Sequence, residues 1–432
     1  MEIFDPAELW GRERIENVQL SRLKSIVTHA RNCGFYRERL DQAGIRADNL
    51  RSLDDIRHIP FTVKQDLRAQ YPAGLLCVPS SKIVRMHCSS GTTGTPVAVC
   101  HTQNDVNAWA DLMARCLHMV GVRREDAFQN MSGYGLFTGG LGIHFGAERL
   151  GCMTIPAGAG NTRRQIKLIK DFRVTVAHIL PSYALILGEH LRSAGEDPRD
   201  LPLRIAVVGA EPYTEEFRKR IEEIFGIKAY NSYGLSEMNG PGVGFECPEQ
   251  HGLHIWEDAY IAEIVEPETG VPVPEGEVGE LVMTSLCREG MPILRYRTRD
   301  LTRFLPGECP CGRAHRRIDR ILGRADDMFI IKGVNVYPMQ IEEVIMTFPE
   351  VGQNYLILLE NDGVGDMMRV QVEVRDEYFV EDMRMLQNLQ KAIARRLRAE
   401  ILLTPKVELM ESNSLPRAEG KAVRVRDLRG NR

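Results

Sequence analysis

Apolar positions along the chain follow two periodicities. Between Ile15 and about Leu40 they recur at helical spacing, which predicts a helix packed on the body of the protein. Beyond residue 80, short apolar runs alternate with helical patterns. Strands are predicted at 83–87, 174–180, 204–208 and 228–231, and helices at 104–120, 183–193 and 214–225. This alternation is typical of parallel βαβ units, whose ligands lie at the carboxyl ends of the strands.

Three polar loops directly follow predicted strands of this series. They cover residues 89–96, 209–212 and 231–237. Because the carboxyl ends of parallel strands meet at one edge of a sheet, we expect all three loops to face one crevice.

The pattern changes twice towards the carboxyl end. Residues 258–286 become rich in strand signals with Pro/Gly turns, which indicates a small β-rich subdomain. After Gly323 come a hairpin at 328–336, a helix from Pro338, strands at 355–359 and 368–374, a helix at 379–399 and a strand at 407–410. We therefore predict an α/β body over residues 1–323, with parallel sheets, followed by a small mobile α+β domain over residues 324–432.

Composition narrows the possible partners. The 432 residues carry a formal net charge of −4, and no run of Lys and Arg alternates with aromatic residues. Neither nucleic acid nor a membrane surface is indicated, so small-molecule substrates are expected. The first residues lack the pattern of a secretory signal, and no stretch of eighteen apolar residues occurs. A cytoplasmic location is expected, and the ten cysteines are interpreted as thiols or metal ligands.

The loop after the strand at 83–87 is rich in glycine and hydroxyl residues. Its backbone N–H groups and hydroxyls suit a phosphate cradle. The residues expected to hold phosphate are Ser89, Ser90, Gly91, Thr92, Thr93 and Gly94. A Walker A loop is excluded because no lysine and helix follow the second glycine. Taken alone, such a segment is more often an ordinary surface turn.

Five motifs in a fixed order make the interpretation specific. They are Ser89–Pro96, Tyr233–Glu237, Tyr296–Asp300, Gly323–Asp327 and Leu415–Lys421. This order closely resembles the adenylate-forming superfamily of acyl-CoA synthetases, luciferases and nonribosomal adenylation domains. The segments 133–140, 209–212 and 255–258 make the chain similar to the phenylacetate–CoA ligase family.

The resemblance implies a two-step reaction. A carboxylate attacks the α-phosphorus of ATP to give an acyl-AMP and pyrophosphate, and the thiol of coenzyme A then displaces AMP. It implies that Lys421 bridges the carboxylate and the α-phosphate, that Ser236 donates to that phosphate, and that Glu237 holds Mg²⁺. Without the resemblance, Lys421 is a solvated lysine of a basic tail and Glu237 a carboxylate at a helix start.

The resemblance also assigns the remaining contacts. Tyr233 is expected to stack on adenine, and Asp300 to accept the ribose hydroxyls with help from Arg324. Asp326 is the expected hinge of the small domain, and the hairpin at Lys332 and Gly333 is expected to shape the pantetheine tunnel. The base is expected to be lined by Ala210, Glu211, Pro212, Asn231, Ser232 and Gly234. A related ligase dimer suggests a homodimer here.

The acyl group is expected to bind in a flat pocket. Tyr134 and Phe137 form one wall, and Gly139, Gly140 and Gly209 leave space for an aryl ring. For either aromatic residue taken singly, packing in the core is nearly as good an explanation. The sequence does not choose among phenylacetate, a hydroxylated phenylacetate, indoleacetate and other aryl acids.

Two cysteine-bearing segments predict a structural zinc site. Cys247 lies close to His254, and Cys309 and Cys311 form a short turn that ends in glycine. Four nitrogen and sulfur ligands close a tetrahedral site. His251 and His315 are possible substitutes for His254, and unpaired cytosolic thiols are the alternative explanation.

Two other functions compete with acid–thiol ligation. One is a related ligase that uses another aryl acid or a non-CoA acceptor, as coenzyme F390 synthetases do. The other is a nonenzymatic nucleotide-binding or carrier module. The charged Lys421, Glu237 and Asp300 argue against the second, because a binder needs no charge placed for a transition state.

Overall fold

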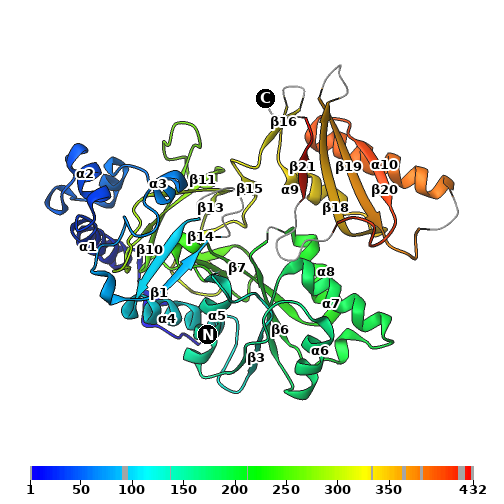
Figure 1. Ribbon diagram of the computed structural model, residues 1–432, viewed down its shortest axis with the longest axis horizontal. Coiled ribbons are helices and arrows are strands. Elements are labelled where there is room, and N and C mark those ends of the chain that lie inside the picture. The colour runs from blue at the N-terminus through cyan, green and yellow to red at the C-terminus, as the bar shows by residue number, and fades with distance from the viewer. Residues whose placement is uncertain are drawn as a thin grey trace. The chain divides into compact units, whose positions relative to one another are not determined.

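The computed structural model describes residues 2–89, 96–136, 138–211, 213–331, 334–361, 366–379, 383–416 and 424–429. The chain forms two compact units (Figure 1). The first unit contains residues 1–180, 199–210 and 227–321, and the second contains residues 181–198, 211–226 and 322–432.

The predicted first helix is two helices, α1 (Arg12–Ala30) and α2 (Gly34–Gln42). Helix α1 buries Ile15, Leu23 and Val27, as its periodicity predicts. The prediction of one continuous helix was wrong because Cys33 has an extended backbone, and its thiol caps α2 by accepting from the Tyr36 amide. Helix α3 spans Lys64–Ala69. Short 3-10 turns are η1 (Pro6–Leu9), η2 (Ala47–Asn49), η3 (Leu53–His58), η4 (Ser80–Lys82), η5 (Pro198–Asp200) and η6 (Ser236–Met238).

A nine-stranded sheet forms the centre of the first unit, in the order β13-β14-β9-β8-β7-β6-β5-β3-β4. Its parallel part consists of β3 (Ala127–Asn130), β4 (Met153–Ile155), β5 (Val176–Ile179), β6 (Ile205–Gly209) and β7 (Lys228–Tyr233). Its antiparallel part consists of β8 (Gly244–Glu246), β9 (Leu253–Ile255), β13 (Phe304–Leu305) and β14 (Arg317–Ile318). Strands β3, β5 and β6 are buried throughout, as parallel strands usually are.

Helices α4 (Gln103–Met119), α5 (Thr138–Leu150) and α6 (Thr162–Asp171) belong to this unit. Glycines allow α5 to approach α4 closely: a Cβ at Gly146 would lie 2.3 Å from Cβ of Met113, and one at Gly142 would lie 2.2 Å from Trp109. The same glycines disguise α5 in the sequence, because glycine is a poor helix former. Helix α5 was not predicted for this reason. Strands β3 and β4 and helix α6 were not predicted either.

Strands β1 (Ile83–Cys88) and β2 (Ala98–Thr102) form a separate antiparallel pair. The expectation that the loop after β1 follows a strand of the parallel sheet was therefore wrong. Locally, a hairpin strand and a parallel strand have the same apolar pattern. The predicted β-rich segment is confirmed, because β10 (Tyr260–Val265) and β11 (Gly279–Ser285) pair antiparallel. Strand β12 (Tyr296–Thr302), which was not predicted, pairs antiparallel with β11.

The second unit contains α7 (Pro181–Ser193), α8 (Glu215–Phe225), β15 (Gly323–Arg324) and the carboxyl-terminal segment. That segment has the predicted hairpin, β16 (Phe329–Ile331) and β17 (Val334–Val336), followed by α9 (Pro338–Ile345). Next come β18 (Val351–Asn361), β19 (Asp366–Val374), α10 (Met383–Ile401), β20 (Lys406–Met410) and β21 (Val425–Asp427). Its sheet has the order β20-β19-β18-β21, and β21 was not predicted.

The α/β class with a smaller α+β carboxyl-terminal part is thus confirmed. No helix in the described ranges is both long and apolar enough to cross a membrane.

Candidate active site and metal cluster

Two of the predicted nucleotide loops begin at the same edge of the sheet. Gly209 ends β6, and it pairs in parallel register with Ser232 of β7. A Cβ at Gly209 would lie 2.3 Å from the Ser232 carbonyl oxygen, so a glycine is required there by strand packing. Ala210 follows with φ of 68°, and Asn231 donates its amide to Glu246. The two loops therefore begin side by side, as expected for a ligand-binding edge.

Tyr233 and Asp300 meet in the folded chain. The Tyr233 hydroxyl donates to Oδ2 of Asp300 at 2.6 Å, and both residues are buried. Tyr233 ends β7 and Asp300 lies in β12, so the contact joins the nine-stranded sheet to the antiparallel one. The residues predicted to contact adenine and ribose are thereby neighbours.

The turn η6 after Gly234 carries Ser236 and Glu237. Glu237 is 6% exposed, and its Oε1 accepts from the Tyr296 hydroxyl at 3.1 Å. The Ser236 hydroxyl lies 3.2 Å from that of Thr138, at the start of α5. Sequence reasoning missed Thr138 and Tyr296 as partners, although both lie within quoted motif segments. Their place within these motif segments is the sequence signal that could have found them.

Tyr134 lies in the expected acyl-pocket segment. Its hydroxyl is 3.2 Å from Nδ1 of His144 in α5, and burial raises the pKa of Tyr134. A Cβ at Gly140 would lie 2.4 Å from the Gly133 carbonyl oxygen, so that glycine is required where α5 packs on the preceding loop. Gly139 is buried in the first turn of the same helix.

Asn130, at the carboxyl end of β3, organises this loop and was not singled out from the sequence. Its Oδ1 accepts from the amide of Ser132 at 3.1 Å and lies 2.9 Å from Nδ1 of His178, while its Nδ2 donates to the Gly140 carbonyl at 2.8 Å. Burial lowers the pKa of His178 to about 4, so the ring is neutral at pH 7 and Nδ1 is the donor. The strand that carries Asn130 was not predicted, which hid the residue.

Several predicted residues lie in the second unit. Glu211 accepts from the amide and hydroxyl of Ser182, at 3.2 and 3.1 Å. Arg324 binds both carboxylate oxygens of Asp326, each at 2.9 Å. The predicted ribose-assisting residue and the predicted hinge residue therefore form an ion pair.

Some predicted residues lie outside the described ranges. They are Ser90, Gly91, Thr92, Thr93, Gly94, Phe137, Pro212, Lys332, Gly333 and Lys421. Ser89 is described, and it pairs with Val97: its amide donates to the Val97 carbonyl and its hydroxyl accepts from the Val97 amide, both at 3.0 Å.

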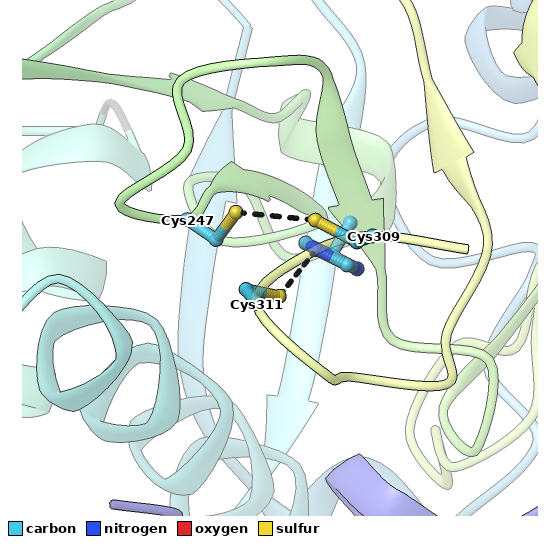
Figure 2. Close-up of side chains that lie close together, drawn as sticks. Cys247, Cys309 and Cys311 are labelled. Carbon is cyan, nitrogen blue, oxygen red and sulfur yellow. Dashed lines mark hydrogen bonds between the residues drawn. The ribbon is translucent and has the colours of Figure 1, made fainter. Parts of the chain in front are cut away.

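The four predicted zinc ligands form one cluster (Figure 2). The donor atoms of Cys247, His254, Cys309 and Cys311 all lie within 4.8 Å of one another. The two sulfurs of Cys247 and Cys309 are 3.6 Å apart, and Sγ of Cys311 is 3.4 Å from Nε2 of His254. Three of the four residues are buried, and Cys311 is partly exposed.

Hydrogen bonding fixes the orientation of the His254 ring. Its Nδ1 donates to the His315 carbonyl at 3.0 Å, which turns Nε2 towards the thiols. Metal-ligating histidines are usually oriented in this way. Burial disfavours the charged ring, but the thiols of Cys309 and Cys311 outweigh it and raise the pKa of His254 to about 8. The hydrogen bond from Cys247 lowers the pKa of the Cys311 thiol, as does His254.

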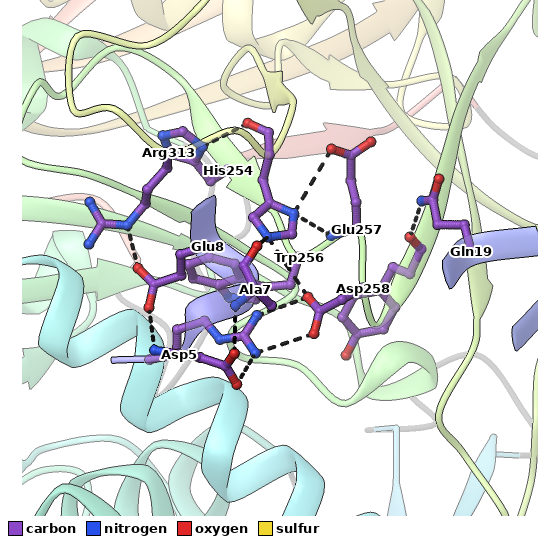
Figure 3. A network of polar contacts seen from close by, with 12 residues as sticks. Asp5, Ala7, Glu8, Gln19, His254, Trp256, Glu257, Asp258 and Arg313 are labelled. Carbon is purple, nitrogen blue, oxygen red and sulfur yellow. Dashed lines mark hydrogen bonds and ion pairs between the residues drawn. The ribbon is translucent and has the colours of Figure 1, made fainter. Parts of the chain in front are cut away.

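The two possible substitutes point elsewhere. Nδ1 of His315 accepts from the Glu257 amide and its Nε2 donates to the Ala7 carbonyl, both at 3.0 Å, within the polar network of Figure 3. His251 contacts Arg317. Within the described residues, His254 is thus the nitrogen donor of the cluster.

The same network ties the amino-terminal turn η1 to the cysteine-bearing segment (Figure 3). Arg313 donates to the Glu8 carboxylate at 2.6 Å, and both side chains are buried. Arg115 binds Asp258 through two contacts, at 2.8 and 3.2 Å, and also binds Asp5. The cysteine cluster therefore lies next to a layer of buried, paired charges.

Known proteins resemble this chain over nearly its whole length. The phenylacetate-coenzyme A ligase of Thermus thermophilus is 47% identical, over 98% of each chain. The enzyme of the same name from Escherichia coli is 45% identical, over 99% of this chain and 98% of that one. The chain belongs to the phenylacetate–CoA ligase family. The AMP-binding enzyme family matches residues 52–287, and the AMP-binding enzyme C-terminal domain matches residues 333–429.

Solved structures of other CoA ligases share the fold of this chain. A 2-hydroxyisobutyryl-CoA ligase in complex with an acyl-AMP ligand has a TM-score of 0.92 and 29% identity, covering 98% of this chain and 91% of that one. An anthranilate CoA ligase, at 18% identity and a TM-score of 0.61, shares the fold over 79% of this chain and 66% of its own. The resemblance found in the sequence is confirmed.

Proposed function

We propose that this enzyme joins phenylacetate, or a close aryl-acetic acid, to coenzyme A through an acyl-adenylate, with release of AMP and pyrophosphate. The observation that carries the proposal is the 47% identity to a phenylacetate-coenzyme A ligase over 98% of both chains. Family membership also confirms the predicted enzyme class, an AMP-forming acid–CoA ligase. Four named relatives at 43–47% identity are CoA ligases, which disfavours a non-CoA acceptor.

The buried contacts support separate roles for the residues at the adenine, the ribose and the phosphates of ATP. Tyr233 presents its ring to adenine while its hydroxyl holds the Asp300 carboxylate, which in turn accepts from the ribose. Arg324 assists at the ribose, and Ala210, Glu211, Pro212, Asn231, Ser232 and Gly234 line the base. Residues Ser89, Ser90, Gly91, Thr92, Thr93 and Gly94 cradle the phosphates, and Ser236 donates to the α-phosphate.

Charge stabilisation falls to two residues. The role proposed for Lys421 is to bridge the attacking carboxylate and the α-phosphate, because positive charge there would offset the repulsion of two anions. Glu237 fits a magnesium site, because its carboxylate is a hard oxygen donor held in place by the Tyr296 hydroxyl. Magnesium bound there would neutralise phosphate charge. The acyl group lies against Tyr134 and Phe137, with Gly139, Gly140 and Gly209 at the pocket.

The experiment that tests the substrate assignment is a panel of acids. Purified enzyme with ATP and magnesium is given phenylacetate, 4-hydroxyphenylacetate, indole-3-acetate or benzoate, with and without coenzyme A. Phenylacetate should give the highest kcat/KM for thioester and AMP formation. A preference for benzoate would refute the aryl-acetate assignment, and AMP release without any thioester would refute coenzyme A as the acceptor.

Removal of the Tyr233 hydroxyl should weaken ATP binding. Tyr233→Phe keeps the ring but loses the 2.6 Å hydrogen bond that orients Asp300. A hydrogen bond to a charged group contributes about 1.5–3 kcal/mol, so we expect KM for ATP to rise ~10-fold while kcat changes less than ~3-fold. Initial rates of pyrophosphate release at graded ATP measure this.

The matched control is Tyr355→Phe in the second unit. There a buried tyrosine hydroxyl donates to Oε2 of Glu342 at 2.7 Å, a similar contact between residues that have no proposed role in nucleotide binding. Tyr355→Phe should lower thermal stability without raising KM for ATP. Equal changes in KM for the two variants would contradict the role given to Tyr233.

We also propose that residues 324–432 rotate about Asp326 between the two half-reactions. In the second step, Lys332 and Gly333 would shape the pantetheine tunnel. Asp326→Pro fixes φ near −65° and should trap one state. We expect acyl-AMP formation to be retained and thioester formation to be strongly reduced. Asp326→Ala is the control, because it also breaks the Arg324 ion pair but leaves φ free. Wild-type rates in both half-reactions of Asp326→Pro would exclude the rotation.

A structural zinc ion at the cysteine cluster is a further part of the proposal. Three thiols and one imidazole are the donor set that zinc prefers, and their mutual distances, within 4.8 Å, suit a tetrahedral site. The ring of His254 already directs Nε2 towards the thiols. Such a site would stabilise the fold and leave no open position for substrate.

The proposal also includes an oligomeric state and a cellular compartment. A homodimer is proposed by analogy with related ligases, and light scattering at micromolar concentration tests it. A cytoplasmic location is supported by the ten cysteines, none of which forms a disulfide. Localisation of a fluorescently tagged chain tests this.

A further inference from the structure

The loop between β11 and β12 buries a positive charge. Arg288 is 2% exposed, and its Nη1 donates to the main-chain carbonyl of Glu237. Its Nε and Nη2 have no acceptor among the described residues. Burial of an incompletely paired charge is unfavourable, so a guanidinium at this position calls for a functional explanation.

The loop that carries this arginine is firmly held. Oδ1 and Oδ2 of Asp105, in the first turn of α4, accept from the amides of Glu289 at 2.7 Å and Gly290 at 2.9 Å. A Cβ at Gly290 would lie 2.9 Å from both the Asp105 carboxylate and the Cys100 carbonyl. Burial lowers the pKa of Arg288, and the Asp105 carboxylate acts in the opposite direction. The main chain that follows Arg288 is therefore fixed to the start of α4.

The other end of the contact is the turn η6. The Tyr260 hydroxyl donates to the Met238 carbonyl at 2.9 Å, and the Tyr296 hydroxyl donates to the Glu237 carboxylate at 3.1 Å. Arg288 is the group that holds the main chain of Glu237 itself. Main chain and carboxylate of one residue are thus fixed by separate partners.

We infer that Arg288 is a positioning residue that sets the orientation of Glu237 for magnesium–ATP. This inference rests on the proposed role of Glu237 as the magnesium ligand. The arginine reaches Glu237 from the β11–β12 loop, whose main chain at Glu289 and Gly290 is held by Asp105 of α4, so it links the turn η6 to that helix. Without it, the turn loses a charged hydrogen bond and the carboxylate samples other orientations.

The test measures magnesium dependence of pyrophosphate release in the full-length enzyme. Loss of a group that orients a metal ligand typically costs ~10–100-fold in metal affinity, so Arg288→Met should raise the half-saturating free Mg²⁺ by ~10–100-fold. Arg288→Lys should give an intermediate value. The control is Arg295→Met, which removes another buried arginine, one that is paired with Glu263 at 2.8 Å. It should lower the melting temperature and leave the half-saturating Mg²⁺ unchanged.

The Glu237→Gln variant distinguishes a failure of the positioning role of Arg288 from a failure of the magnesium role of Glu237. If Glu237→Gln does not change the magnesium dependence, the metal assignment fails. If it does, and Arg288→Met has the wild-type value, only the positioning role is overturned. In the Glu237→Gln background, Arg288→Met should add no further shift, because the two residues act in series. If Arg288→Met does not fold, Asp105→Asn decides: it loosens the Arg288 loop and should raise the half-saturating Mg²⁺, and an unchanged value overturns the inference.

Discussion

Replacement of Lys421 by alanine is expected to slow pyrophosphate release by ~10²–10⁴-fold, which corresponds to about 3–5 kcal/mol of transition-state stabilisation. The first half-reaction forces a carboxylate against a phosphate, so a nearby positive charge is worth most there. In the second half-reaction a neutral thioester forms from an acyl-AMP. Synthetic phenylacetyl-AMP and coenzyme A should therefore still give thioester within about 10-fold of the wild-type rate.

Quenched time courses of both half-reactions measure this difference. Lys391→Ala, at an exposed position of α10, is the control and should leave both steps at the wild-type rate. Thermal melts verify that each variant is folded. If Lys421→Ala slows both half-reactions equally, Lys421 has a structural or general binding role and the assignment is wrong.

Replacement of Cys309 by serine is expected to abolish zinc binding and to destabilise the protein. The binding free energy of a structural zinc ion is folding free energy, so its loss should cost several kcal/mol. Each 1 kcal/mol lowers the melting temperature of a domain of this size by about 2–4 °C, so a decrease of roughly 10 °C is expected. Elemental analysis should find about one zinc per wild-type chain and almost none in Cys309→Ser.

Cys152→Ser provides the matched control, because Cys152 is a similarly buried thiol that contacts the Arg123 carbonyl and lies outside the cluster. It should retain zinc. Wild-type protein purified without chelators that contains no zinc would exclude the metal site, as would an unchanged metal content in Cys309→Ser.

The sequence predicted the features that depend on local pattern. The parallel strands β5 and β6 are short, buried and largely apolar, and the helices that follow them are amphipathic, so these elements could be located. The four residues of the cysteine cluster could be chosen because a Cys-x-Cys turn and a cysteine near a histidine are rare patterns. Helix α5 was not predicted because it is rich in glycine. Only the structure shows that these glycines pack against α4.

Contacts between distant segments could not be predicted. The Tyr233–Asp300 hydrogen bond spans 67 positions in the sequence, and each residue alone is unremarkable. Arg288 is one of several arginines in its segment, and only the fold shows that its charge is buried against the Glu237 main chain. Motif order therefore identified the chemistry, whereas the geometry supplied the residues that position it.

The central claim is that the acid is activated as an adenylate before coenzyme A reacts. Enzyme in excess over phenylacetate is mixed with magnesium and ATP, without coenzyme A, and quenched for mass spectrometry. The account predicts enzyme-bound phenylacetyl-AMP with an equal amount of pyrophosphate, and its conversion to thioester and AMP when coenzyme A is added. Release of ADP and phosphate, or thioester formation with no adenylate at any time point, would contradict it.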